Sequence, residues 1–252
     1  MVDTVGMRSD DLHALLAEVS RELVRISIED RQGVISLPQT YPGGSAVVVR
    51  MRPDGEDYIV TDNGLGFVEA DHLGGSAIYA RIAPATAKVH GVRYDGDMMF
   101  AAQVPRDWLA NAIVFVSSAS RRAVEATAQK LAEERDNETR ARFRARLAEA
   151  FPGEAAFGVP FVGRSTKEWH FEAIVRLKGH AALFDLVTPN HVSVASSIVK
   201  FQDVVRLEDG PRGIAVLVDR KHMDAADITM ISEAASSVVT LDASASALRK
   251  AA

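Results

Sequence analysis

The stretch Phe171–Val187, FEAIVRLKGHAALFDLV, decides the fold of the second half of the chain. Lys178-Gly179 suits a two-residue turn, and apolar residues alternate with other residues on both sides of it. Pairing the two arms across this turn predicts an antiparallel hairpin that brings Glu172 opposite Asp185. Alternation predicts one buried face, made of Phe171, Ala173, Val175, Leu177, Ala182, Phe184 and Leu186.

The residues after this hairpin alternate between helical and strand patterns. Val192–Val204 predicts a helix, Gly213–Val218 a buried strand, and Val238–Leu241 another strand. Asp224 caps a helix that runs to about residue 235, and a short helix ends the chain. A hairpin followed by such crossovers predicts a mixed sheet with helices on both faces.

The first half of the chain predicts an α+β arrangement with hairpins. Ala46–Arg52 and Asp57–Thr61 form one hairpin, and residues 91–103 form a second. Asp62-Asn63-Gly64 is typical of a turn, and Ser76–His90 predicts a helix interrupted at Pro84. An amphipathic helix precedes these elements, with its apolar stripe at Leu12, Leu15, Leu16, Val19, Leu23 and Ile26.

A long helix links the two halves. Pro105 suits the start of a helix, Ser117–Ser120 indicates a break, and residues 121–151 predict a charge-rich helix that stops at Pro152-Gly153. The expected organisation is therefore mixed α/β of the α+β type. An N-terminal α+β domain at 1–120 precedes a connecting helix at 121–151, and a C-terminal mixed α/β domain follows at 152–252.

Composition narrows the class of protein. The 252 residues are 47% hydrophobic and 25% charged, with a net charge of −5 and no cysteine. Disulfides, thiolate metal sites and cysteine nucleophiles are excluded. The start of the chain does not resemble a signal peptide, and no run approaches the roughly 20 apolar residues that span a bilayer. We expect a cytoplasmic protein without a membrane partner.

The N-terminal half resembles a family of bacterial and phage proteins built from paired domains of unknown function. The similarity rests on the N-terminal helix, on SAVVVRM, on YIVTDNG, on HGVRYDGDMMF and on WLANAIVFVSSASRRAVE, and covers roughly residues 10–150. The second domain of that family would span the rest of the chain. The resemblance implies a bacterial or mobile-element origin and transfers no catalytic residue.

The C-terminal half resembles the core of restriction-endonuclease-like nucleases. In those enzymes the second of two paired strands carries a carboxylate, one intervening residue and a lysine, whereas here the string is Asp185-Leu186-Val187. Glu172 and Asp185 are the candidate catalytic and Mg²⁺-binding residues, and Lys200 on the next helix is the candidate replacement for the missing lysine. The alternative is an exposed face on which Arg176 or Arg164 neutralises the two carboxylates.

Arginines recur along the long helix. Helical spacing places Arg140 beside Arg144 and Arg142 beside Arg146, so these four are candidate nucleic-acid-binding residues. The alternative is a solvated helix whose arginines pair with acidic neighbours on the same helix. His170, His180 and His191 lie near the hairpin ends, but their spacing matches no metal-binding pattern.

Two classes of function follow from these patterns. The missing lysine and the acidic balance favour a non-catalytic interaction protein of phage or mobile-element origin, built on a decayed nuclease fold. The alternative is a Mg²⁺-dependent nuclease-like enzyme with its site in the C-terminal domain. Whether the chain is an enzyme, and whether its partner is a protein or nucleic acid, stays open at this level. The deciding feature is whether a lysine reaches Glu172 and Asp185 in the fold.

Overall fold

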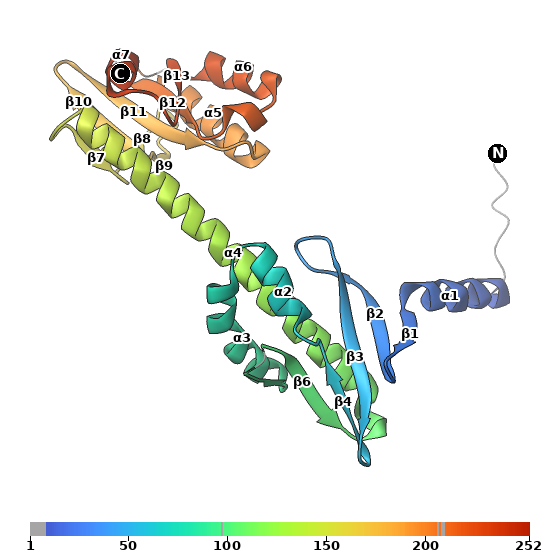
Figure 1. The fold of residues 1–252 in the computed structure, drawn as a ribbon. Coiled ribbons are helices and arrows are strands. Elements are labelled where there is room, and N and C mark those ends of the chain that lie inside the picture. The colour runs from blue at the N-terminus through green and yellow to red at the C-terminus, as the bar shows by residue number, and fades with distance from the viewer. Residues whose placement is uncertain (1–8, 97, 206, 208–209) are drawn as a thin grey trace, which may run out of the picture. The chain divides into compact units, whose positions relative to one another are not determined.

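A computed structural model describes residues 9–96, 98–205, 207 and 210–252 (Figure 1). The fold is mixed α+β, as the sequence predicts. The chain divides into two compact units, Met1–Glu134 and Arg135–Ala252. The division falls inside the long helix α4 (Leu109–Ala150), so each unit includes part of that helix.

The first unit contains a six-stranded sheet in the order β1-β2-β3-β4-β6-β5. Both predicted hairpins are confirmed: β3 pairs with β4, and β5 pairs with β6, although Asp97 lies outside the described residues. The sequence patterns do not predict the hairpin that β1 and β2 form. The elements are α1 (Ser9–Leu23), β1 (Arg25–Glu29), β2 (Gln32–Thr40), β3 (Ala46–Asp54), β4 (Asp57–Thr61), α2 (Leu65–His72), α3 (Ser76–His90), β5 (Arg93–Tyr94) and β6 (Phe100–Val104).

Two predicted helix breaks are wrong. The helix α3 continues through Pro84, and α4 continues through Ser117–Ser120 after a short 3₁₀ turn at Arg106–Trp108. The serine hydroxyls find partners without opening the helix. Ser117 Oγ donates to the carbonyl of Val114 at 3.1 Å, and Ser120 Oγ donates to Asp62. One face of the sheet packs against α2, α3 and α4 through a core that includes Val49, Tyr79 and Val116.

The second unit contains a five-stranded mixed sheet in the order β13-β12-β11-β10-β7. The predicted hairpin is confirmed in its register, because Leu177 pairs with His180 and Ala173 with Phe184. Strand β11 then pairs parallel with β12, and β12 with β13. The elements are β7 (Ala155–Phe157), β8 (Pro160–Val162), β9 (Glu168–His170), β10 (Ala173–Leu177), β11 (His180–Val187), α5 (His191–Val205), β12 (Arg212–Leu217), a 3₁₀ turn (Arg220–His222), α6 (Ala225–Ala234), β13 (Ser237–Thr240) and α7 (Ala245–Ala251).

Helices cover both faces of this sheet, as the sequence predicts. On one face, Phe143 and Leu147 of α4 pack with Phe184. On the other face, Phe201 of α5 packs with Leu183 and with other residues of α5, α6 and the sheet. Phe171 belongs to this second face and not to the predicted one, because it lies before the first residue of β10 and leaves the strand's alternation.

Candidate functional site

Glu172 and Asp185 lie in one pocket of the second unit. Glu172 immediately precedes β10, and Asp185 is in β11, so the hairpin register carries both to the same end of the strand pair. Both are buried, with 4% and 6% of their surface exposed. The alternative of an ordinary exposed face is therefore wrong for these two residues, because α4 and α5 cover them.

Asp185 is bound to the helix α5. Lys200 Nζ donates to its carboxylate at 3.1 and 3.2 Å, and Ser197 Oγ donates to it at 2.9 Å. Positions three apart share one face of a helix, so Ser197 and Lys200 reach the same side chain. Lys200 Nζ also donates to the carbonyl of His170 at 3.0 Å. A lysine thus lies within contact distance of one candidate carboxylate.

Glu172 is bound to the helix α4. Arg144 Nε donates to Glu172 Oε1 at 2.6 Å, and Arg140 Nη1 donates to Glu172 Oε2. Arg140 also pairs with Asp136 at 2.9 Å. The prediction that Arg176 or Arg164 neutralises the pair is wrong for Glu172. Its partners are arginines that the sequence suggested only for nucleic acid.

The electrostatics of the pocket follow from burial. Burial raises the pKa of Asp185, while the charge of Lys200 and hydrogen bonds from Lys200 and Ser197 oppose that rise. The negative charge of Glu172 raises the pKa of Asp185 further. The two carboxylates therefore still repel each other, although each has a cationic partner.

The pocket is lined mainly by polar and charged side chains. Its cavity has a volume of about 390 Å³ and is lined by both carboxylates, by Arg140, Arg144 and Lys200, and by Ser193, Ser196, Ser197 and His170. Three cationic side chains and two carboxylates thus face one space. Such an arrangement can hold a cation between its carboxylates or an anion between its cations.

The other predicted residues lie elsewhere in the second unit. Arg142 is exposed, and Arg146 donates to the carbonyl of Ala243 at 3.0 Å. His180 contacts the carbonyl of the C-terminal Ala252 at 2.9 Å, and His191 is the exposed first residue of α5. Of the four arginines proposed for nucleic acid, the structure brings Arg140 and Arg144 to the carboxylates and not Arg142 or Arg146.

A buried polar cluster in the first unit surrounds Asp62, the first residue of the predicted turn. Its side chain is fully buried and accepts hydrogen bonds from the backbone of Phe100 at 2.8 Å and from Ser120 Oγ at 2.6 Å. The backbone nitrogens of Gly64 and Gly66 donate to it at 3.2 and 3.3 Å. Burial raises the pKa of Asp62 against these donors. The cluster joins the start of α2 to α4 and β6, which is a structural role.

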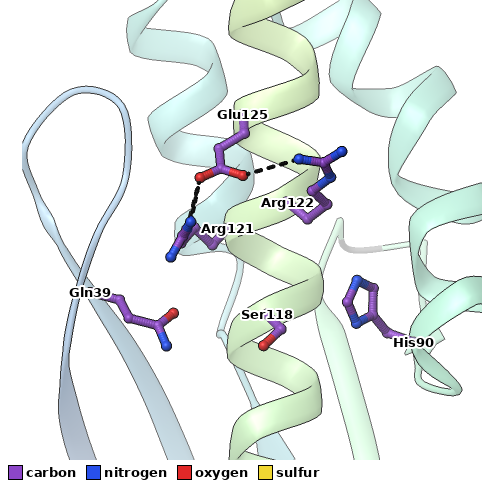
Figure 2. Close-up of a pocket in the computed structure, with 6 residues that line it drawn as sticks. All are labelled: Gln39, His90, Ser118, Arg121, Arg122 and Glu125. Carbon is purple, nitrogen blue, oxygen red and sulfur yellow. Dashed lines mark hydrogen bonds and ion pairs between the residues drawn. The ribbon is translucent and has the colours of Figure 1, made fainter.

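The first unit also contains a polar pocket, which lies along α4 (Figure 2). Its cavity has a volume of about 330 Å³. Glu125 lies between Arg121 and Arg122, at 2.7 and 3.6 Å, so one carboxylate offsets part of the charge of two guanidinium groups. Gln39, Ser118 and His90 complete the lining.

The described part of the chain contains neither a cluster of metal ligands nor a helix that could span a membrane. Within those residues no group of three or more histidine, aspartate and glutamate side chains could hold a metal ion. A divalent cation in the C-terminal pocket would therefore have two carboxylate ligands at most. Among the helices of the described ranges, none combines the length and the apolar character that crossing a bilayer requires.

Comparison with known proteins does not place the chain in a family. No protein-family model matches it, and searches of curated proteins and of solved structures also found no match.

Proposed function

We propose that the C-terminal pocket is the site of a Mg²⁺-dependent enzyme that hydrolyses phosphodiester bonds of nucleic acid. One observation carries the proposal: Lys200 Nζ lies 3.1 Å from a carboxylate oxygen of Asp185. The sequence of β11 has valine where a nuclease of the restriction-endonuclease type would have lysine. A lysine supplied by α5 offers the same charge at the same carboxylate.

The order of elements supports the proposal. Apart from β8 and β9, which pair in a separate two-stranded sheet between β7 and β10, the second unit follows the order helix, three antiparallel strands, helix and parallel strand, in α4, β7, β10, β11, α5 and β12. That order is similar to the order of elements in the core of restriction-endonuclease-like nucleases. Fold similarity alone does not give an activity, so the proposed activity rests on the residues of the pocket.

The donor set fits a magnesium ion. Mg²⁺ prefers oxygen ligands and is commonly held by one or two carboxylates plus water and substrate phosphate. Glu172 and Asp185 would supply those two carboxylates. When bound, the ion would lower the pKa of a water molecule and stabilise charge on the phosphate. Arg140, Arg144 and Lys200 would have to release some of their present contacts with the carboxylates to admit it.

The basic side chains have a role in the proposed reaction. Hydrolysis adds a water oxygen to phosphorus, breaks one phosphorus–oxygen ester bond, and leaves a proton on the departing oxygen. Negative charge grows on the phosphate during this exchange. Arg140 and Arg144 can donate to phosphate oxygens, and Lys200 can place a positive charge beside the reacting group.

A second candidate function is non-catalytic binding of a partner by a decayed site. One observation favours it: all four oxygens of the two carboxylates already accept from a cation. Carboxylates paired in this way need no metal ion to offset their charge. On this alternative, the arginines and Lys200 serve the fold or bind an anionic group of a protein or nucleic-acid partner.

A cleavage assay separates the two candidates. Wild-type protein is incubated with duplex and single-stranded DNA and RNA, with Mg²⁺, with Mn²⁺ or with chelator. We expect metal-dependent cleavage that is lost in Asp185→Asn and in Lys200→Ala and retained in the exposed controls Glu233→Gln and Lys221→Ala. Failure to cleave any of these substrates with either metal ion would favour the non-catalytic alternative.

A further inference from the structure

Apolar side chains are exposed at the start of the first unit. Among the residues that the structure describes, seven of the sixteen exposed large hydrophobic side chains lie between Leu12 and Ile28. Five of them form the stripe of α1, and the other two are Ile26 and Ile28 of β1, which are 74% and 83% exposed. A concentration of this kind is typical of a surface that another molecule covers.

The strand β1 is also an edge strand. It pairs with β2 on one side and ends the sheet on the other, where α1 leads into it (Figure 1). Ile26 lies opposite Ile35 of β2, which packs against the core of this unit. Ile26 and Ile28, which share one face of β1, therefore extend the core-facing side of the sheet to its edge. An edge of this kind is a ready template for one more strand.

The sequence of β1 is complementary to itself. If two copies pair antiparallel about Ser27, Arg25 faces Glu29 of the other copy and Ile26 faces Ile28 of the other copy. Residues 25 and 29 then share one face, and the isoleucines share the other. Moving the centre by one residue in either direction separates Arg25 from Glu29 and leaves one isoleucine pair in place of two. Opposite charges and β-branched residues are favourable cross-strand pairs.

We infer that this chain forms a symmetric dimer in which the β1 strands of two copies pair antiparallel about Ser27. The two sheets join into one, and each edge loses its unpaired backbone groups. The four isoleucines of the two copies form a continuous apolar patch. In each copy the apolar stripe of α1 directly precedes β1 and supplies side chains to cover this patch. The partner is a second copy because the contacts that β1 offers match its own sequence.

Glu29 remains available for this contact. Its side chain is 52% exposed, accepts a hydrogen bond from Ser27 Oγ at 3.3 Å, and pairs with Arg50 of its own copy at 3.3 Å. A carboxylate has two oxygens and can accept from a second guanidinium group. The pairing therefore adds a cation to Glu29 without breaking the contact with Arg50.

Complementary charge variants test the dimer and its register by sedimentation equilibrium on the full chain. Wild type is expected to be dimeric. Arg25→Glu and Glu29→Arg should each weaken self-association by roughly tenfold or more, because both symmetric pairs change from attraction to repulsion. An equimolar mixture of the two variants should recover the dimer, because each mixed pair joins a carboxylate with a guanidinium group.

An apolar variant completes the test, with circular dichroism as the check of folding. Ile26→Lys combined with Ile28→Lys should leave a folded monomer. The matched control Val89→Lys changes an equally exposed residue of α3, at 83%, and should leave the dimer intact. A monomeric wild type at high micromolar concentration would overturn the inference. So would a mixture of charge variants that associates no better than either variant alone.

Discussion

Replacing Asp185 with asparagine tests how the pocket balances its charges. Asparagine keeps the shape of the side chain and can still accept from Lys200, but it removes the buried negative charge. Burial and the charge of Glu172 raise the pKa of Asp185 despite its contacts with Lys200 and Ser197. Ionising this carboxyl group is therefore less favourable in the folded state than in the unfolded state. We expect Asp185→Asn to be at least as stable as wild type near neutral pH without metal.

The size of this effect follows from the groups involved. Glu172 and Asp185 lie just beyond the last residue pair of the β10–β11 ladder, and like charges opposite each other in such a ladder repel by about 0.2–1 kcal/mol, which sets the scale. For a unit of this size, 1 kcal/mol raises the melting temperature by roughly 2–8 °C. The exposed variant Glu233→Gln on α6 serves as the control and should stay close to wild type. A loss of more than about 1 kcal/mol in Asp185→Asn would refute the argument, because the ion pair with Lys200 would then outweigh burial.

The pH dependence gives a second check on the same variant. An aspartate whose pKa is raised in the folded state destabilises the fold as pH rises from its unfolded value, about 3.9, through its folded value. Below that window both states are protonated and the penalty is absent. The advantage of Asp185→Asn should therefore appear as pH rises above the ordinary aspartate range and vanish at lower pH.

Magnesium turns the same experiment into a test of function. A ligand that binds only the folded state stabilises it by about 2.7 kcal/mol at one hundred times its dissociation constant. If Glu172 and Asp185 hold the ion, Mg²⁺ should raise the melting temperature of wild type and leave Asp185→Asn unchanged. The order of stability of the two proteins would then reverse with metal. An unchanged wild-type melting temperature would contradict the proposed metal site.

Three further predictions concern the remaining polar clusters. Ser120→Ala should lower the free energy of unfolding by about 1–3 kcal/mol in urea denaturation, because buried Asp62 loses its shortest hydrogen bond. Gly66→Ala should also destabilise the fold in the same assay, by about 1–3 kcal/mol, because its added methyl group would lie 2.6 Å from Tyr79 Oη. Hydrogen bonds from Trp169 and Ser165 lower the pKa of Asp203 in the folded state. Asp203 therefore adds stability above pH ~3.9, and this stability is lost as pH falls through the lower folded pKa. Asp203→Ala should flatten the acid side of the stability–pH curve.

The hairpin of the second unit could be predicted because its information is local. The turn at Lys178-Gly179 and the alternation of the two arms determine the register, and Gly179 adopts a positive φ of 93°, which glycine takes without steric cost. The β1–β2 hairpin is equally local, but its turn lacks the residue types that usually mark one. Its turn is at Asp30 and Arg31, which have positive φ values of 48° and 65° without any glycine.

The partners of the site residues could not be predicted, because they depend on distant packing. The sequence indicated that Glu172 and Asp185 share one end of the hairpin, and it named Lys200 as the lysine that could reach them. It did not indicate that Arg140 and Arg144, on the preceding helix, bind Glu172. That contact depends on how α4 lies over the sheet, which helical spacing does not determine. The burial of Asp62 likewise depends on Ser120, 58 residues away.

The position of Val187 explains why the lysine of the pocket comes from a helix. Val187 is two residues after Asp185, so both point to the same face of β11, the face that α5 covers. Val187 is fully buried among the apolar residues of that face, where an ammonium group would lose its hydration. Lys200 approaches the same carboxylate from α5 and keeps 19% of its side chain exposed. The apolar core and the charged pocket therefore share one face of the strand, and the helix above it supplies the charge that the strand cannot.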